Sequence, residues 1–166
     1  STPYALATGE PVYFSAGTLP PQLSLNTIYY AIPYSNDQFY RMATTYENAI
    51  NGSFIDLSTV GSLTAQLAIP GYFKGKQVNL GQKITVSTTG SLPGGLSTGD
   101  YFGIRLGSAF VDRQYLATSL PNALSRTIHL ITSVGSGTQT LSLFLTPRTL
   151  GEFGGEESHT LTREEL

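Results

Sequence analysis

The sequence predicts an all-β protein built from two tandem modules, each a small β-barrel or β-sandwich with one short helical turn, followed by a C-terminal extension. Two observations predict this fold: a motif that occurs twice, and a composition rich in strand and turn residues. Residues 17–24 (GTLPPQLS) return as residues 90–97 (GSLPGGLS), and the pattern Tyr-Tyr-Ala-Ile at 29–32 returns as Tyr-Phe-Gly-Ile at 101–104. Self-similarity in the same order and spacing is the signature of a repeated structural unit. The predicted boundaries are a first module at 1–67, a packed linker at 68–80, a second module at 81–146 and the start of a collar-like segment at 147–166.

Strands are expected where β-branched and aromatic residues lie between turn residues. In both copies the first strand is followed by a break at Pro20-Pro21 or Pro93-Gly94-Gly95, because proline fixes φ and glycine accepts positive φ. The expected strand pairs are 11–15 with 83–87, 28–32 with 101–105, 39–42 with 110–113, 54–57 with 128–131, and 63–67 with a longer closing strand at 138–145.

One short helical turn is expected in each copy, at 45–50 and 119–124, because these segments are small and polar and do not alternate. Each module of about 60 to 70 residues is near the lower limit for an independent core. The linker contains Pro70 and two glycines, which favour a loop, but Tyr72 and Phe73 favour packing. We therefore expect the two modules to contact each other.

Charged residues make up 12% of the chain, compared with about 25% in ordinary globular domains. Residues 1–151 carry six acids and eight bases, and residues 152–166 carry five acids and one arginine. Neither part offers the basic stripe that binding to nucleic acid requires. No apolar run is long enough to insert in a membrane, and no signal-peptide pattern opens the chain. Cysteine is absent, which excludes disulfides and thiolate chemistry.

Groups that could carry catalysis are few. The chain has two histidines, His129 and His159, and lacks a Gly-x-Ser-x-Gly motif. No histidine and acid cluster has the spacing of metal ligands, and the acids of the modules are scattered singly, unlike the facing pair of a glycosidase. We therefore expect neither an enzyme nor a bound cofactor or metal. These single acids are Asp37, Glu47, Asp56, Asp100 and Asp112.

Tyrosines are concentrated in the first module, where seven of the ten fall within residues 1–46. Adjacent strand residues point to opposite faces, so either Tyr29 or Tyr30 is expected to face outward. Such rings serve either ordinary β-packing and a subunit interface, or a surface that binds glycan or protein. The candidate binding or interface residues are Tyr34, Tyr40, Tyr46, Tyr72 and Phe73.

The end of the chain carries a more specific pattern. Residues 154–162 (GGEESHTLT), followed by Glu164-Glu165-Leu166, resemble the opening of the phage tail-collar domain found in tail fibres. The repeated Gly-x-Leu-Pro-x-x-Leu with its following Tyr-Tyr or Tyr-Phe is similar to modules common in phage tail and fibre proteins. The proline and closely spaced histidines with which the collar motif continues are not in this chain, so no metal site is carried over. The candidate docking residues of this segment are Phe153, Glu156, Glu157 and His159.

The resemblance implies a virion protein of a phage tail, fibre or baseplate, made in the host cytoplasm and acting as a spacer or attachment unit. It implies copies of itself, most often trimers in fibres, and other tail proteins as partners. An alternative is a module that binds a host surface glycan or protein through the tyrosines of the first copy. A polysaccharide depolymerase is the least favoured interpretation.

Overall fold

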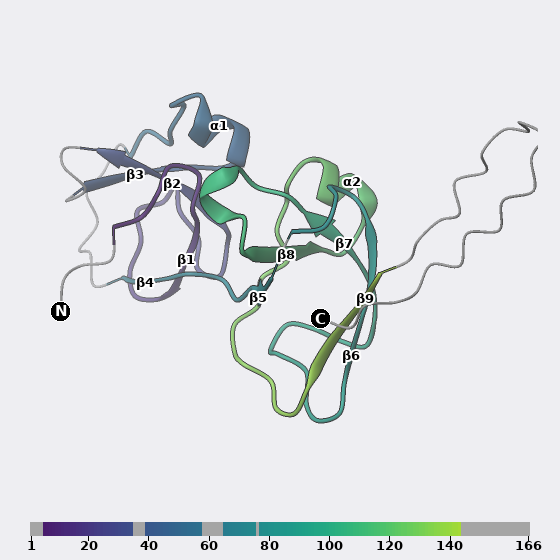
Figure 1. Ribbon diagram of the computed structural model, residues 1–166. Coiled ribbons are helices and arrows are strands. Elements are labelled where there is room, and N and C mark those ends of the chain that lie inside the picture. The colour runs from purple at the N-terminus through teal and green to yellow at the C-terminus, as the bar shows by residue number, and fades with distance from the viewer. Residues whose placement is uncertain (1–4, 35–38, 58–64, 76, 144–166) are drawn as a thin grey trace, which may run out of the picture.

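The computed structural model describes residues 5–34, 39–57, 65–75 and 77–143, and within them it confirms the all-β class (Figure 1). Two antiparallel sheets have the strand orders β3-β2-β1-β4 and β5-β8-β7-β6-β9. We call β1 to β4 with α1 the first module, and β5 to β9 with α2 the second. The first contains β1 (Pro11–Ala16), β2 (Tyr29–Tyr34), β3 (Phe39–Ala43), α1 (Tyr46–Ile50) and β4 (Gln66–Ala68). The second contains β5 (Phe73–Lys74), β6 (Lys83–Thr88), β7 (Gly99–Ile104), the 3-10 turn η1 (Ser108–Phe110), β8 (Arg113–Ala117), α2 (Leu120–Leu124) and β9 (Gln139–Leu143).

The repeat in the sequence is also a repeat of strand register. Val12 lies opposite Tyr29 in the first sheet, and 72 residues later Ile84 lies opposite Tyr101 in the second. Strands β3-β2-β1-β4 thus correspond in order to β8-β7-β6-β9. The segment 63–67 overlaps β4 and its expected partner in the repeat, 138–145, contains β9; these strands pair with β1 and β6 respectively.

The second sheet differs by one added strand, which comes from the segment expected to be a linker. Phe73 of β5 lies opposite Gln114 of β8, so the linker extends the sheet at its edge. In the first sheet the corresponding edge is β3. The linker is therefore part of the second module's sheet as well as a connection between the modules.

One expected strand pair is wrong, and in a second pair the member at 39–42 is confirmed as β3 but its counterpart is not. Residues 54–57 and 128–131 are not strands. Each stretch donates a backbone hydrogen bond to the strand beside it, from Ile55 N–H to Met42 O of β3 and from His129 N–H to Leu116 O of β8. Residues 110–113 were expected as a strand, but η1 occupies part of this segment and β8 begins only at Arg113. Buried Phe110 anchors the tight turn in the core, which delays the start of the strand.

The expected helical turns are confirmed, and both begin with the same cap. The side chain of Thr45 accepts a hydrogen bond from Asn48 N–H, and that of Ser119 accepts one from Asn122 N–H. Such caps satisfy backbone donors that a helix start leaves free. One positive-φ residue follows each helix, Gly52 or Arg126.

Each module has a local core, and a third core is shared between the modules. The local cores contain Tyr29 and Tyr101, whose hydroxyls accept from Ser24 N–H (2.8 Å) and Ser97 N–H (3.0 Å). The shared core includes Tyr30. Tyr29 and Tyr30 are 5% and 3% exposed, so the expectation that one of them faces outward is wrong. The reason is that both faces of β2 are covered, one by the local core and the other by the second module.

Candidate functional site

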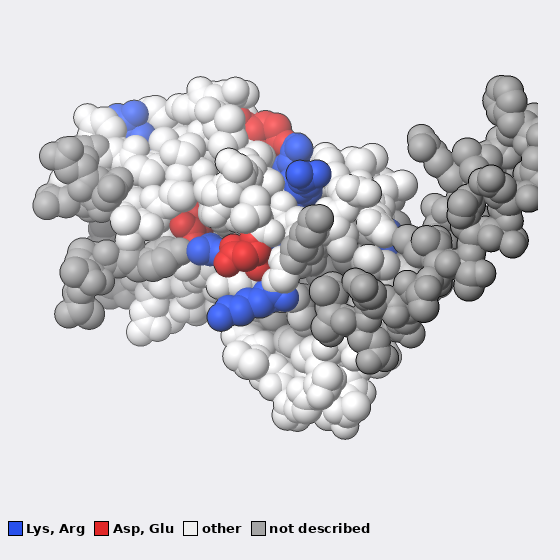
Figure 2. Space-filling view, viewed as in Figure 1, with Lys and Arg blue, Asp and Glu red and all other residues white. Residues whose placement is uncertain are grey.

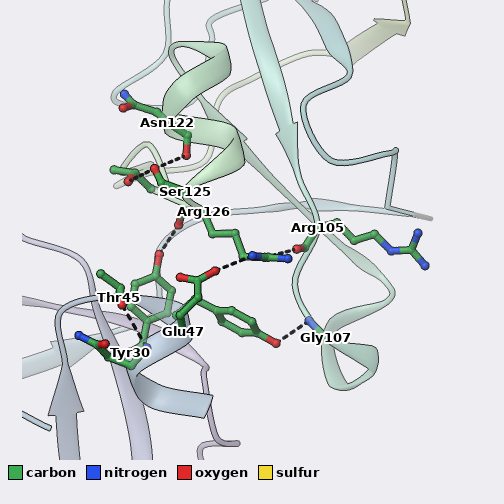
Figure 3. Close-up of polar contacts among 11 residues, drawn as sticks. Tyr30, Thr45, Glu47, Arg105, Gly107, Asn122, Ser125 and Arg126 are labelled. Carbon is green, nitrogen blue, oxygen red and sulfur yellow. Dashed lines mark hydrogen bonds and ion pairs between the residues drawn. The ribbon is translucent and has the colours of Figure 1, made fainter. Parts of the chain in front are cut away.

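The interface between the modules is the most elaborate arrangement of side chains in the described residues. Figure 3 shows α1 and β2 of the first module facing the loops that flank β7 and α2 of the second. The Tyr30 hydroxyl donates to the Arg126 carbonyl (2.5 Å), and the Tyr46 hydroxyl accepts from Gly107 N–H (2.8 Å). Tyr30 belongs to the shared core of both modules, and Tyr46 packs against that core. The expectation that the modules contact each other is therefore confirmed.

Charged groups are paired across this interface. Arg126 binds Glu47 (2.5 Å) and also donates from Nε to the Arg105 carbonyl (3.1 Å). Arg113 binds Glu10 (2.6 Å), whose side chain is only 2% exposed. On the face drawn in Figure 2, acidic and basic side chains adjoin near the middle of the molecule, with wide uncharged areas on either side. Two ion pairs thus join the modules, whereas Lys83 and Asp100 pair within the second module.

Burial also acts on the hydroxyls of the shared core. It raises the pKa of Tyr115 to about 12, although Arg113 nearby favours the ionised form. It raises the pKa of Tyr30 still further, with the negative charge of Glu47 acting in the same direction. Both tyrosines are therefore neutral at ordinary pH. Tyr30 serves as a packing and hydrogen-bonding group, and Tyr115 as a packing group of the shared core.

A second feature is a cleft of about 360 Å³ between the linker and the second module. The linker is fixed there by a hydrogen bond from Gly71 N–H to the Ile131 carbonyl (2.8 Å). A Cβ atom on Gly71 would lie 2.6 Å from the Ile131 side chain, so glycine allows the close approach. The cleft is lined by Ile69, Gly71, Tyr72, Phe73, Lys74, Pro93, Ile131, Thr132, Ser133, Val134, Gly135 and Gln139.

The repeated Gly-Ser-Leu-Pro segment supports one wall of this cleft. Ser136 N–H donates to the Ser91 carbonyl (2.9 Å), and Gly94 N–H donates to Ser133 Oγ (3.0 Å). A Cβ on Gly135 would come within 2.2 Å of the Ser91 carbonyl oxygen. The two loops therefore lie in direct contact, and they hold Ser133 and Gly135 at the cleft.

The structure separates the five candidate aromatic residues. Tyr72 and Phe73 line the cleft together, and Tyr46 lies in the interface between the modules. Tyr40 is half-buried, with its hydroxyl accepting from Leu6 N–H (3.2 Å). Tyr34 is 52% exposed. The four docking candidates Phe153, Glu156, Glu157 and His159 lie outside the described residues.

Sequence reasoning missed the partners of Tyr34. The guanidinium of Arg41 lies over the Tyr34 ring (4.1 Å to its centre) and over the Phe54 ring (4.2 Å). Phe54 and the neighbouring Phe39 are 46% and 63% exposed. We call Tyr34, Phe39, Arg41 and Phe54 the edge patch, because β3 forms an edge of its sheet. The dense aromatics of residues 29–40 were the only signal for it in the sequence.

The residues that could carry catalysis have structural partners. His129 Nε2 lies 2.5 Å from the Gly95 carbonyl and its ring contacts Tyr101. Asp100 binds exposed Lys83, which holds the pKa of that carboxyl below its usual value. Among the described residues, no three histidine or acidic side chains are grouped as a metal site would require. No helix in the same part of the chain is long and apolar enough to cross a membrane.

Comparison with known protein families, with curated proteins and with solved structures finds no match to this chain.

Proposed function

We propose that this chain is a structural component of a phage or phage-like tail, fibre or baseplate, in which its two modules act as one rigid spacer and attachment unit. The observation that carries the proposal is the shared core, together with the buried Arg113–Glu10 pair. Two domains joined by a flexible linker move independently, whereas an apolar interface with paired buried charges holds them together. A spacer that holds other tail proteins at a fixed distance needs modules that do not move relative to each other.

Two further features support this role. The low charge content leaves wide uncharged surfaces for neighbouring subunits (Figure 2). The similarity of residues 154–162 to the opening of the tail-collar domain supports a place in a tail fibre. The proposed partners are copies of the same chain and other tail proteins.

The proposal can be tested by labelling intact virions that contain this chain with gold-conjugated antibodies raised against the purified protein. We expect labelling of the tail, fibre or baseplate by electron microscopy. We also expect light scattering of the purified chain at micromolar concentration to show an oligomer, with a trimer favoured by the resemblance. Normal tails on particles that lack the chain would overturn the proposal.

The edge patch favours a second candidate, a module that binds a host surface glycan or protein. Exposed aromatic rings around an arginine are typical of binding surfaces. If this is the function, Tyr34→Ala will reduce binding of the protein to host cells by at least tenfold, while Val111→Ala, at another exposed apolar position, will leave it unchanged. Equal cell binding by the two variants would contradict this candidate.

A further inference from the structure

The cleft beside the linker has mostly apolar walls. Aliphatic side chains of Ile69, Pro93, Ile131 and Val134 line it together with the two linker aromatics. Its volume of about 360 Å³ is within the range of about 300 to 1,000 Å³ that is usual for ligand pockets. A group with a largely apolar body therefore suits the cleft.

One residue of the cleft lining, Gln139, also carries a hydrogen-bond acceptor without a partner. Its oxygen Oε1 is buried and has no hydrogen-bond partner among the residues that the structure describes. The amide orientation is fixed, because Nε2 of the same side chain donates to the carbonyls of Ser91 (3.0 Å) and Ser136 (2.9 Å). A buried acceptor without a partner is unfavourable. A ligand in this cleft therefore gains by bringing an N–H or O–H donor.

These two properties select among ligand classes. A saccharide carries hydroxyls on every side and needs several polar partners, whereas most of this lining is apolar and Ser133 Oγ already accepts from Gly94 N–H. Tyrosine and tryptophan side chains combine an apolar body with a single donor at one end. They also dominate the energetics of protein interfaces when they enter pockets.

We propose that the cleft binds a tyrosine or tryptophan side chain of a partner protein, whose O–H or N–H donates to Gln139 Oε1. That the partner is another tail protein rests on the proposed function. The type of side chain that the cleft binds is argued from the cleft alone. The linker residues Tyr72 and Phe73 thereby have a role in assembly in addition to joining the modules.

Titration of the full-length, ¹⁵N-labelled chain with N-acetyl-tyrosinamide tests the proposal, with N-acetyl-phenylalaninamide as the matched probe that lacks the donor. We expect millimolar binding, seen as NMR shift changes in residues 72–74 and 131–135. The tyrosine probe should bind about fivefold more tightly, because one neutral hydrogen bond has this effect on affinity. Equal affinities, or shift changes elsewhere, would overturn the proposal.

Two variants sharpen the test. Gln139→Lys keeps a donor for the two carbonyls but removes the acceptor, so the difference between the two probes should disappear. Val134→Glu, at a rim position that is 95% exposed, should weaken both probes at least threefold without affecting the fold. Val111→Glu, exposed but outside the cleft lining, is the control and should bind both probes like the wild type.

Other outcomes are equally informative. Preferential binding of methyl α-glucoside in the cleft would overturn the choice of an aromatic side chain. Absence of any binding would show that the cleft is not a site for such groups. If virion labelling fails but the tyrosine probe binds as expected, the proposed function is wrong and the cleft is still a binding site. If labelling succeeds but the probe does not bind, the proposed function is supported and the cleft is not a site for such side chains.

Discussion

The first and second modules end their helices at equivalent positions with different residues, glycine in one and arginine in the other. Gly52 has a φ of 74° and Arg126 a φ of 54°. Their N–H groups donate to Ala49 and Ala123, the same position in each helix. Positive φ is unfavourable for arginine, yet this residue donates to Glu47 and Arg105 and accepts from a tyrosine at the interface. The repeated module therefore determines the positive φ at this position, whereas the contacts between the modules determine which side chain occupies it.

The turn before the first strand of each module shows the same division. Glu10 Oε2 accepts from Ala7 N–H (2.9 Å) in one module, and Gln82 Oε1 accepts from Asn79 N–H (3.4 Å) in the other. Only Glu10 also meets an arginine of the other module. A position at which the two copies differ in charge therefore marks the contact between them.

The largest expected effect comes from breaking the buried pair between the modules. Arg113→Met leaves the carboxylate of Glu10 buried without its partner, which we expect to lower the free energy of unfolding by about 3 to 5 kcal/mol. Adding Glu10→Gln, the residue type of the second module, should recover most of that loss. Urea unfolding followed by circular dichroism measures both. An Arg113→Met variant as stable as the wild type would show that the pair does not hold the modules together.

The next effect is a loss of stability at alkaline pH. Tyr115 keeps its proton in the folded state up to a pKa of about 12, whereas in the unfolded chain it titrates near 10. Its contribution is therefore complete below pH 10 and is lost as the pH rises towards 12, by about 2 to 3 kcal/mol. Tyr115→Phe should be less sensitive to pH between 10 and 12 than the wild type. Identical pH slopes for the two proteins would contradict the burial argument.

A smaller effect should separate backbone strain from side-chain contacts at Arg126. Arg126→Ala loses the contacts with the first module and keeps the unfavourable φ, whereas Arg126→Gly loses the contacts but relieves the strain. We expect the glycine variant to be about 1 kcal/mol more stable than the alanine variant. Thermal unfolding of the two variants checks this, with Gly52→Ala as the matched change in the first module. A more stable alanine variant would rule out positive φ as the cause.

The smallest effect tests the equivalence of the two helix caps. Thr45→Ala and Ser119→Ala each remove one side-chain acceptor, with expected losses of about 1 kcal/mol. Because the cap geometry is repeated, the two losses should agree to within about 0.5 kcal/mol. Chemical denaturation measures them, and Ser53→Ala, at an exposed position after α1, provides a control. A large difference between the two variants would mean that the helices do not contribute equally to stability.

Much of the fold could be predicted from the sequence, because local patterns determine it. The repeat, both helical turns and most strands follow from alternation, turn residues and caps. No strand forms at 128–131, where Ile128 packs in the shared core and Ile131 lines the cleft. The turns at Gly9-Glu10 and Gly81-Gln82 were not predicted. In each, a glycine precedes an acid or its amide, and the two turns lie 72 residues apart.

The candidate sites depend on contacts between distant residues, so less of them could be predicted. Tyr72 and Phe73 were expected to pack in the linker, and they do line a cleft with the second module. Nothing local distinguishes Gln139 from other polar strand residues, because one of the carbonyls that hold its amide belongs to Ser91, 48 residues earlier in the sequence. The pairing of Arg113 with Glu10 likewise depends on how the modules pack.

The contacts between the modules are not reciprocal. Glu47 of the first module binds Arg126 of the second, but the positions equivalent to these two residues hold Pro121 and Gly52, which carry no charge. Association through two different surfaces is heterologous, and its repetition lengthens a row instead of closing a symmetric pair. The second module has Pro121 at the position of Glu47, so it lacks the carboxylate through which the same contact could be repeated.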